Sequence, residues 1–191
     1  MKIIDISKEM FSADVYPGDP TPVLEWKKHI GVNGSQSNFS VLTSGSHAAT
    51  HLDAPYHFVD EGCTMEALPL ATFYGPCTVA TAQGRLTGEE TRALLKPGCT
   101  RLLLRGHAQG FFTGESGAVL QEAGVILVGT ESQTIGDGDA HRAILGRGIA
   151  VLEGLDLSAA PDGDYILAAF PLKMNGVEAT FTRAVLLVPE K

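Results

Sequence analysis

Four side chains able to bind a metal or carry a proton stand close together in the sequence: His47, His51, Asp53 and His57. All four occupy odd positions, and side chains two residues apart along an extended strand share one face. A helix would separate them, because at about 100° per residue His47 and His51 stay together while the other two turn away. Pro55 also favours an extended conformation for the residue before it. The spacing therefore predicts a strand running into a turn, with all four side chains on one side.

This set of side chains has the chemistry of a metal site. Two imidazoles and a carboxylate suit a zinc or manganese ion, which takes N and O donors. His57 is then left near the ion, and a histidine beside a metal-activated water suits general acid/base chemistry because its pKa lies near neutrality. The alternative is a protein in which metal only holds the fold. Structural zinc usually has four protein ligands, often cysteines, but all three cysteines of this chain lie outside the motif.

Two more metal-capable residues stand downstream. Glu153 ends the apolar run 148–153, and a carboxylate at the buried end of a strand costs several kcal/mol unless it is paired or binds metal. His141 follows a predicted helix start at Asp139. If that helix packs back on the strand, both residues could join Asp53 in a second metal position, with Asp53 bridging two ions about 3.5–4 Å apart. Spacing alone leaves this open, because a strand-end glutamate can also cap a neighbour or reach water.

Length and composition set the class of protein. A chain of 191 residues with 44% hydrophobic residues predicts one domain, 1–191, with a sizeable core. The net charge of −8 and the absence of basic runs argue against nucleic acid or an anionic membrane as partner. Residues 1–9 lack the apolar core of a signal peptide, and no segment approaches the length of a membrane span. Three widely spaced cysteines fit reduced thiols, so we expect a cytoplasmic protein.

Short apolar runs separated by Gly and Pro predict a strand-rich α/β fold. Helices are expected at 87–95, where Thr87 and Glu90 form a capping-box pattern, at 117–123, and at 139–145 with Asp139 as N-cap. Strands are expected at 2–6, 78–82, 101–104, 125–128, 149–152 and 184–188. The proline-rich loop 15–22 is either a plain surface turn or a rigid support that holds Tyr16 as the wall of a pocket.

The motif at 47–57 resembles that of the cyclase-like metal-dependent hydrolase family, which includes bacterial kynurenine formamidases and isatin hydrolases. The family pattern reads His-x-Gly-Thr-His-x-Asp-x-Pro-x-His, and this chain keeps every donor while Ala49 replaces the glycine. Further similarity lies at 16–20, 68–70 and 141–155, so the resemblance spans nearly the whole chain. It implies a swivelling β/β/α domain that forms homodimers or tetramers.

The resemblance also implies roles for individual residues. His47, His51 and Asp53 would bind one divalent ion, and Asp53, His141 and Glu153 a second. His57 would be the proton donor and acceptor, and Tyr16 would contact the substrate. Two departures are expected to touch the pocket wall: Glu131 stands where many members have Asp, and the segment 177–183 replaces the usual Gly-Ser/Ala-Pro before Arg183.

From these features we expect a metal-dependent hydrolase that cleaves an amide C–N bond in a small molecule. An N-formyl or aryl amide is favoured, as in an arylformamidase, with zinc as the preferred ion and metal-activated water as the nucleophile. One alternative is hydrolysis of a cyclic amide, imide or lactone with one manganese ion and the first three ligands. The other is a catalytically inactive, metal-containing protein that binds a small molecule.

Overall fold

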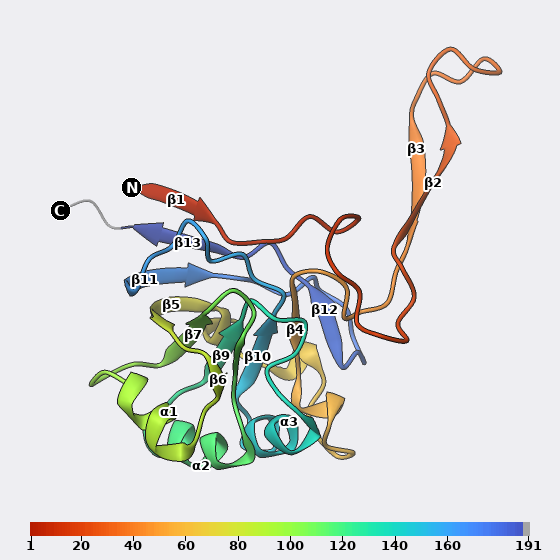
Figure 1. Ribbon diagram of the computed structural model, residues 1–191. Coiled ribbons are helices and arrows are strands. Elements are labelled where there is room, and N and C mark those ends of the chain that lie inside the picture. Colours follow the sequence, from red (N-terminus) through yellow and green to blue (C-terminus); the bar gives the residue numbers. More distant parts are fainter. Residues whose placement is uncertain (189–191) are drawn as a thin grey trace.

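Within the described residues, 1–188, a nine-stranded mixed sheet forms the body of the protein (Figure 1). The structure is a computed structural model. In spatial order the strands are β1 (Lys2–Asp5), β13 (Val185–Val188), β11 (Gly163–Ala168), β5 (Tyr74–Thr81), β7 (Arg101–Arg105), β9 (Leu127–Thr130), β10 (Ala150–Glu153), β4 (His51–Asp53) and β12 (Ala179–Phe181). The central strands β5, β7, β9 and β10 are parallel, whereas the strands on either side of them pair antiparallel.

Helices α1 (Gly88–Leu94), α2 (Gly114–Glu122) and α3 (Gly138–Leu145) lie together on one face of the sheet, at the bottom of Figure 1. Each belongs to a crossover between parallel strands. The short strands β6 (Gly84–Arg85) and β8 (Gly110–Phe111) precede α1 and α2. Three 3-10 helices, η1 (Pro55–His57), η2 (Met65–Ala67) and η3 (Leu70–Phe73), lie between β4 and β5. No helix among the described residues is long and apolar enough to cross a membrane. The predicted strand-rich α/β class is confirmed.

The helix starts follow their caps, and two starts differ from the predicted ones. The capping box of Thr87 and Glu90 opens α1 as expected. Helix α2 begins three residues earlier than predicted, because a capping box starts at Thr113. Ser116 takes the place of the usual glutamate in this box, and its hydroxyl accepts a hydrogen bond from the Thr113 amide at 3.1 Å. Asp139 is not the N-cap of α3. Asp137 is, because its carboxylate accepts from two amides of the first helical turn, at 3.1 and 3.0 Å.

The sheet separates two apolar cores because side chains alternate along each strand. In β7, Leu102 and Leu104 pack under the helices, whereas Leu103 joins a second cluster on the other face. That second cluster also receives Ile4 from β1 and Leu186 from β13, at the far end of the sheet. All five leucine and isoleucine side chains are buried. The sheet therefore curls around a core of its own, which also includes Leu52 of β4 and Leu152 of β10.

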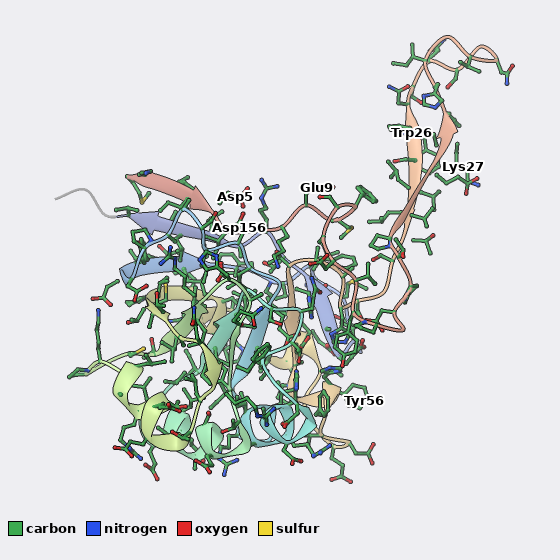
Figure 2. All side chains as sticks on the ribbon, viewed as in Figure 1. Asp5, Glu9, Trp26, Lys27, Tyr56 and Asp156 are labelled. Atoms are coloured by element: carbon green, nitrogen blue, oxygen red, sulfur yellow. The ribbon has the colours of Figure 1, made fainter. Side chains whose placement is uncertain are left out.

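A two-stranded hairpin, β2 (Val23–Lys28) and β3 (Phe39–Thr43), projects away from this body (Figure 1). The sequence reading did not predict these strands. Large apolar side chains remain exposed along the hairpin, including Trp26 at 51% and Phe39 at 53% of their surface. Figure 2 shows Trp26 and Lys27 far from the rest of the fold.

Candidate metal centre

The four clustered side chains of the motif come from three different local structures. His51 and Asp53 lie in β4, His47 lies in the turn before it, and His57 ends η1. The predicted strand therefore begins only at His51, and the expectation that it also includes His47 is wrong. Ala49 adopts a left-handed backbone conformation with φ of +52°, which breaks the extended run before His51. The side chains still converge, since His47 Nδ1 lies 3.1 Å from Asp53 Oδ1 and the His47 and His57 ring centroids are 4.1 Å apart.

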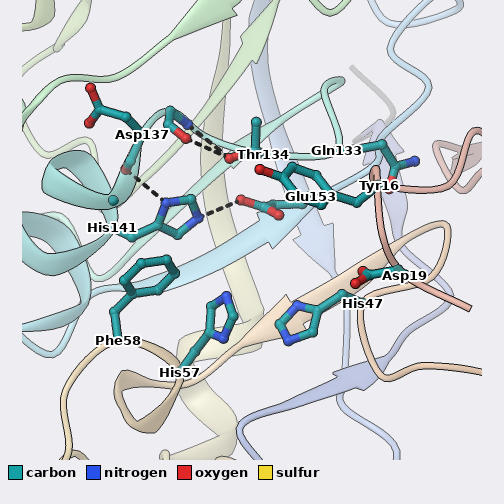
Figure 3. Close-up of a pocket in the computed structure, with 12 residues that line it drawn as sticks. Tyr16, Asp19, His47, His57, Phe58, Gln133, Thr134, Asp137, His141 and Glu153 are labelled. Carbon is teal, nitrogen blue, oxygen red and sulfur yellow. Dashed lines mark hydrogen bonds and ion pairs between the residues drawn. The ribbon is translucent and has the colours of Figure 1, made fainter.

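Strand register brings the second set of residues to the same place. Because β10 pairs antiparallel with β4, Glu153 stands directly opposite His51. Glu153 Oε2 lies 3.3 Å from His51 Nε2, and Glu153 Oε1 lies 3.2 Å from His141 Nε2. His141 comes from the first half of α3, which packs against β10. Figure 3 shows His141 and Glu153 facing the imidazoles of His47 and His57 across the pocket.

Backbone carbonyls orient two of the histidines. His51 Nδ1 lies 3.1 Å from the carbonyl oxygen of Ala49, and His141 Nδ1 lies 3.0 Å from that of Asp137 (Figure 3). A carbonyl can only accept a hydrogen bond, so Nδ1 must carry the proton in both rings. Each Nε2 is then the nitrogen that faces Glu153, and it can bind an ion once it has given up its proton. Metal-binding histidines are commonly oriented in this way, through the nitrogen that does not touch the ion.

Unpartnered buried atoms test whether a metal fits here. Among the described residues, His51 Nε2 and both carboxylate oxygens of Asp53 are shielded from solvent and make no hydrogen bond. A buried carboxylate that makes no hydrogen bond costs several kcal/mol, which a bound cation would offset. The donor set of imidazole nitrogens and carboxylate oxygens suits zinc or manganese. The residues therefore fit a divalent ion.

Donor atoms fall into two groups in which all members lie within 4.8 Å of one another. One group is His47, Asp53 and His57, and the other is His51, Asp53 and Glu153. Asp53 belongs to both groups, as a bridging carboxylate would. The groups differ from the sets implied by the family resemblance, because His57 takes the place of His51 in the first and His51 that of His141 in the second.

Burial and mutual charge set the protonation of these groups. Burial lowers the pKa of His51, but the carboxylates of Asp53 and Glu153 outweigh it and raise the pKa to about 9. Burial raises the pKa of Glu153, but the hydrogen bond from His141 and the nearby imidazole of His51 outweigh it and bring the pKa to about 2. Burial lowers the pKa of His57 below its ordinary value. At neutral pH His57 is therefore a neutral imidazole able to accept a proton.

These side chains open into a pocket of about 250 Å³ (Figure 3). Tyr16 and Asp19, from the proline-rich loop, form part of its wall. Phe58 lies opposite, with its ring stacked on that of His141 at 4.5 Å. None of the described residues that line the pocket is a lysine or arginine. The size and the aromatic wall suit a small planar molecule.

Sequence reasoning missed two residues here and misplaced a third. Gln133 lines the pocket, and both polar atoms of its amide are shielded from solvent with no hydrogen-bond partner among the described residues. Glu178 lies 3.4 Å from His47. In the sequence, its segment 177–183 stood out only because it departs from the family pattern. Glu131 does not line the pocket as expected. Its carboxylate instead accepts backbone hydrogen bonds from Gly106, His107 and Leu157, at 2.7, 2.7 and 3.1 Å.

Comparison with known proteins places the chain in a family. The Cyclase family model matches residues 4–136. Kynurenine formamidases of Paracidovorax citrulli and Salinibacter ruber are each 34% identical to this chain, over 97% of its length and 96% and 97% of theirs. The chain belongs to the cyclase family. The family predicted from the 47–57 motif is thus confirmed.

Solved structures agree with this cyclase-family assignment. A structure described as a potential metal-dependent hydrolase with cyclase activity is 25% identical, with a TM-score of 0.82 over 97% of this chain and 96% of that one. Isatin hydrolase A from Labrenzia aggregata shares the fold, with a TM-score of 0.85 at 21% identity over 99% of this chain and 94% of that one. This cyclase-family protein is a hydrolase of non-peptide C–N bonds, as the sequence predicted, and its donor groups suit a divalent metal.

Proposed function

We propose that this cyclase-family protein is an arylformamidase, which hydrolyses the N-formyl group of an arylamine of the N-formylkynurenine type. The observation that carries the proposal is the buried donor set of His51 Nε2 and the Asp53 carboxylate, which makes no hydrogen bond and lies beside the neutral imidazole of His57 in a small pocket. The kynurenine formamidases, at 33–34% identity over 97% of the chain, support the substrate class.

In this proposal His47, His51 and Asp53 hold one divalent ion, and Asp53, His141 and Glu153 hold a second. Zinc is the preferred ion and manganese the alternative, since both take imidazole and carboxylate donors. A divalent ion bound there polarises the amide carbonyl and lowers the pKa of a water molecule. The Nε2 atoms of His51 and His141 support the assignment, because the backbone carbonyls bind only Nδ1 and leave Nε2 facing Glu153.

His57 moves the proton in this mechanism. Its neutral imidazole accepts a proton from the attacking water and then donates it to the leaving nitrogen, which would otherwise depart as an unstable amine anion. The ring is held between His47, at a centroid distance of 4.1 Å, and Phe58, which meets it edge-on at 4.6 Å. Those contacts fix the ring at the pocket wall, where the scissile bond must lie.

The remaining walls bind the substrate. Tyr16 stands on a loop stiffened by prolines and contacts the aryl ring in this proposal. Gln133 carries a donor and an acceptor that no described residue satisfies, and a substrate carbonyl or N–H would satisfy them. An amide substrate offers both groups.

A panel of substrates with and without metal tests the proposal. We expect the zinc- or manganese-loaded chain to release formate from N-formyl arylamines and to lose this activity when chelated. The similarity to the isatin hydrolase fold makes a cyclic amide the second candidate. Ring opening of isatin at a higher kcat/KM than deformylation would favour that candidate. No turnover on either class by the metal-loaded chain would identify a binding protein instead.

We also propose a homodimer or tetramer in the cytoplasm. An isolated two-stranded hairpin is marginally stable in water, yet β2 and β3 extend from the body with Trp26 and Phe39 exposed. Packing against a second copy would cover these side chains. Light scattering should show a dimer or larger assembly, and Trp26→Glu should shift it towards monomer. A monomeric parent chain would contradict this arrangement. The cytoplasm is proposed because the three cysteines are free thiols, as is usual in a reducing compartment.

A further inference from the structure

Sheet register fixes a third carboxylate beside the metal centre. Glu178 directly precedes β12, which pairs with β4 so that Ala179 stands opposite Asp53. The carbonyl of Glu178 accepts a hydrogen bond from the Ala54 amide at 2.8 Å. The backbone of Glu178 is therefore anchored next to the strand that carries two of the proposed ligands.

The side chain of Glu178 reaches the nitrogen of His47 that faces away from Asp53. His47 Nδ1 lies 3.1 Å from Asp53 Oδ1, and His47 Nε2 lies 3.4 Å from Glu178 Oε1. The two nitrogens of an imidazole point in different directions, so an ion shared with Asp53 lies on the Nδ1 side. Ser46 donates a hydrogen bond from its hydroxyl to the same Glu178 oxygen.

We propose that Glu178 is a positioning residue for His47. Its carboxylate, in ion-pair contact with Nε2, keeps the proton on that nitrogen and so leaves the Nδ1 lone pair directed at Asp53 and the ion. The inference rests on the proposed role of His47 as a metal ligand. A carboxylate behind a metal-bound histidine fixes the tautomer and makes the imidazole a stronger donor.

His47 differs in this respect from the other histidines of the site. His51 and His141 are oriented by backbone carbonyls, whereas His47 has a side-chain partner. A single substitution at Glu178 can therefore remove the group that orients the His47 ring. The segment 177–183, which departs from the family pattern, thereby acquires a role at the metal centre.

Metal affinity of the full chain tests the inference. Glu178→Ala should weaken zinc binding, measured by chelator competition at fixed pH, by about 10–100-fold while the number of ions at saturation stays the same. Glu178→Gln keeps an acceptor oxygen at the same distance and should recover part of the loss. Glu66→Ala is the matched control, because this exposed glutamate accepts a hydrogen bond at 3.1 Å from the amide of Gly176, two residues before Glu178.

A second readout reports the ring of His47 directly. Nitrogen-15 NMR of the metal-loaded parent should show His47 protonated at Nε2, and Ser46→Ala should weaken zinc binding less than Glu178→Ala does. The inference is overturned if Glu178→Ala binds zinc as tightly as Glu66→Ala, or if it loses one ion per chain, which would make Glu178 a ligand. A parent chain that binds no metal overturns the proposed function as well. A parent that binds metal but is indifferent to Glu178 overturns the inference alone.

Discussion

Gly154 is the residue on which the shape of the metal centre should depend most sharply. It follows Glu153 and has a left-handed backbone with φ of +67°. A Cβ added there would lie 2.1 Å from the carbonyl oxygen of Ala49, whereas ordinary contacts begin at 3.4 Å. The same carbonyl accepts the hydrogen bond from His51 Nδ1. We therefore expect Gly154→Ala to push this carbonyl away by more than an ångström and to release His51.

The cost has two parts. An alanine in the left-handed region costs about 1–2 kcal/mol, and relieving an overpacked contact typically costs about 1–3 kcal/mol. Together they should lower the free energy of unfolding by about 3 kcal/mol. For a chain of this size that is a fall in Tm of roughly 6–12 °C. A displacement of about 1 Å at His51, a proposed ligand, should in addition cost on the order of 10²-fold in kcat/KM.

Thermal denaturation of the metal-free chain and zinc titration measure the two effects separately. Gly148→Ala is the matched control, because Gly148 also has a positive φ, +72°, but open space where the Cβ would lie. That variant should lose only about 1–2 kcal/mol and keep its zinc affinity. If Gly154→Ala is no less stable than Gly148→Ala and binds zinc like the parent chain, the account of this contact is wrong.

Other changes test separate parts of the site. His57→Ala should keep metal but lose about 10²–10⁴-fold in kcat on a formamide, and less on an activated ester whose departing oxygen needs little protonation. Equal losses on both substrates would exclude a leaving-group acid. Glu153→Gln should lower the metal content by about one ion per chain in elemental analysis, and an unchanged count with normal activity would return Glu153 to a structural role. In the chelated chain the pKa of His51, about 9, lies above its ordinary value of 6.5. Its contribution to stability is therefore complete below pH 6.5 and lost as the pH rises through 9, so Tm should fall over this range. Zinc affinity should rise over the same range, because the ion displaces the proton, and a rising Tm would have the wrong sign. Gln133→Leu should lower kcat/KM by about 3–10-fold without lowering Tm, since it removes a buried amide that has no partner. A fall in Tm at unchanged kcat/KM would show that the amide serves the fold.

The sequence was most informative where the signal is local. The side-chain period of two and the donor types identified the cluster at 47–57, and the Thr87 and Glu90 pair identified the start of α1. The same period wrongly placed His47 in the strand, because it assumes that the strand is unbroken from 47 to 53. Ala49 breaks it in a left-handed conformation that a glycine would have signalled and an alanine conceals.

The contacts that could not be predicted depend on pairing between strands that are far apart in the sequence. The contact of Glu153 with His51 depends on the register of β10 against β4, which the apolar pattern of either strand does not reveal. Glu178 reaches His47 from 131 residues further along the chain through the pairing of β12 with the same strand. Neither residue stands in a spacing that marks a ligand. The hairpin was missed because its strands have no buried face to impose an alternation of apolar and polar residues.

Formate release from an N-formyl arylamine, followed while zinc is added to the metal-free chain, tests the central claim most directly. The account predicts no turnover without metal and turnover that rises with added zinc to a plateau at about two ions per chain. Turnover that is undiminished in the chelated chain would contradict a metal-dependent hydrolase. The absence of turnover at saturating zinc, in a chain shown to bind it, would contradict an arylformamidase.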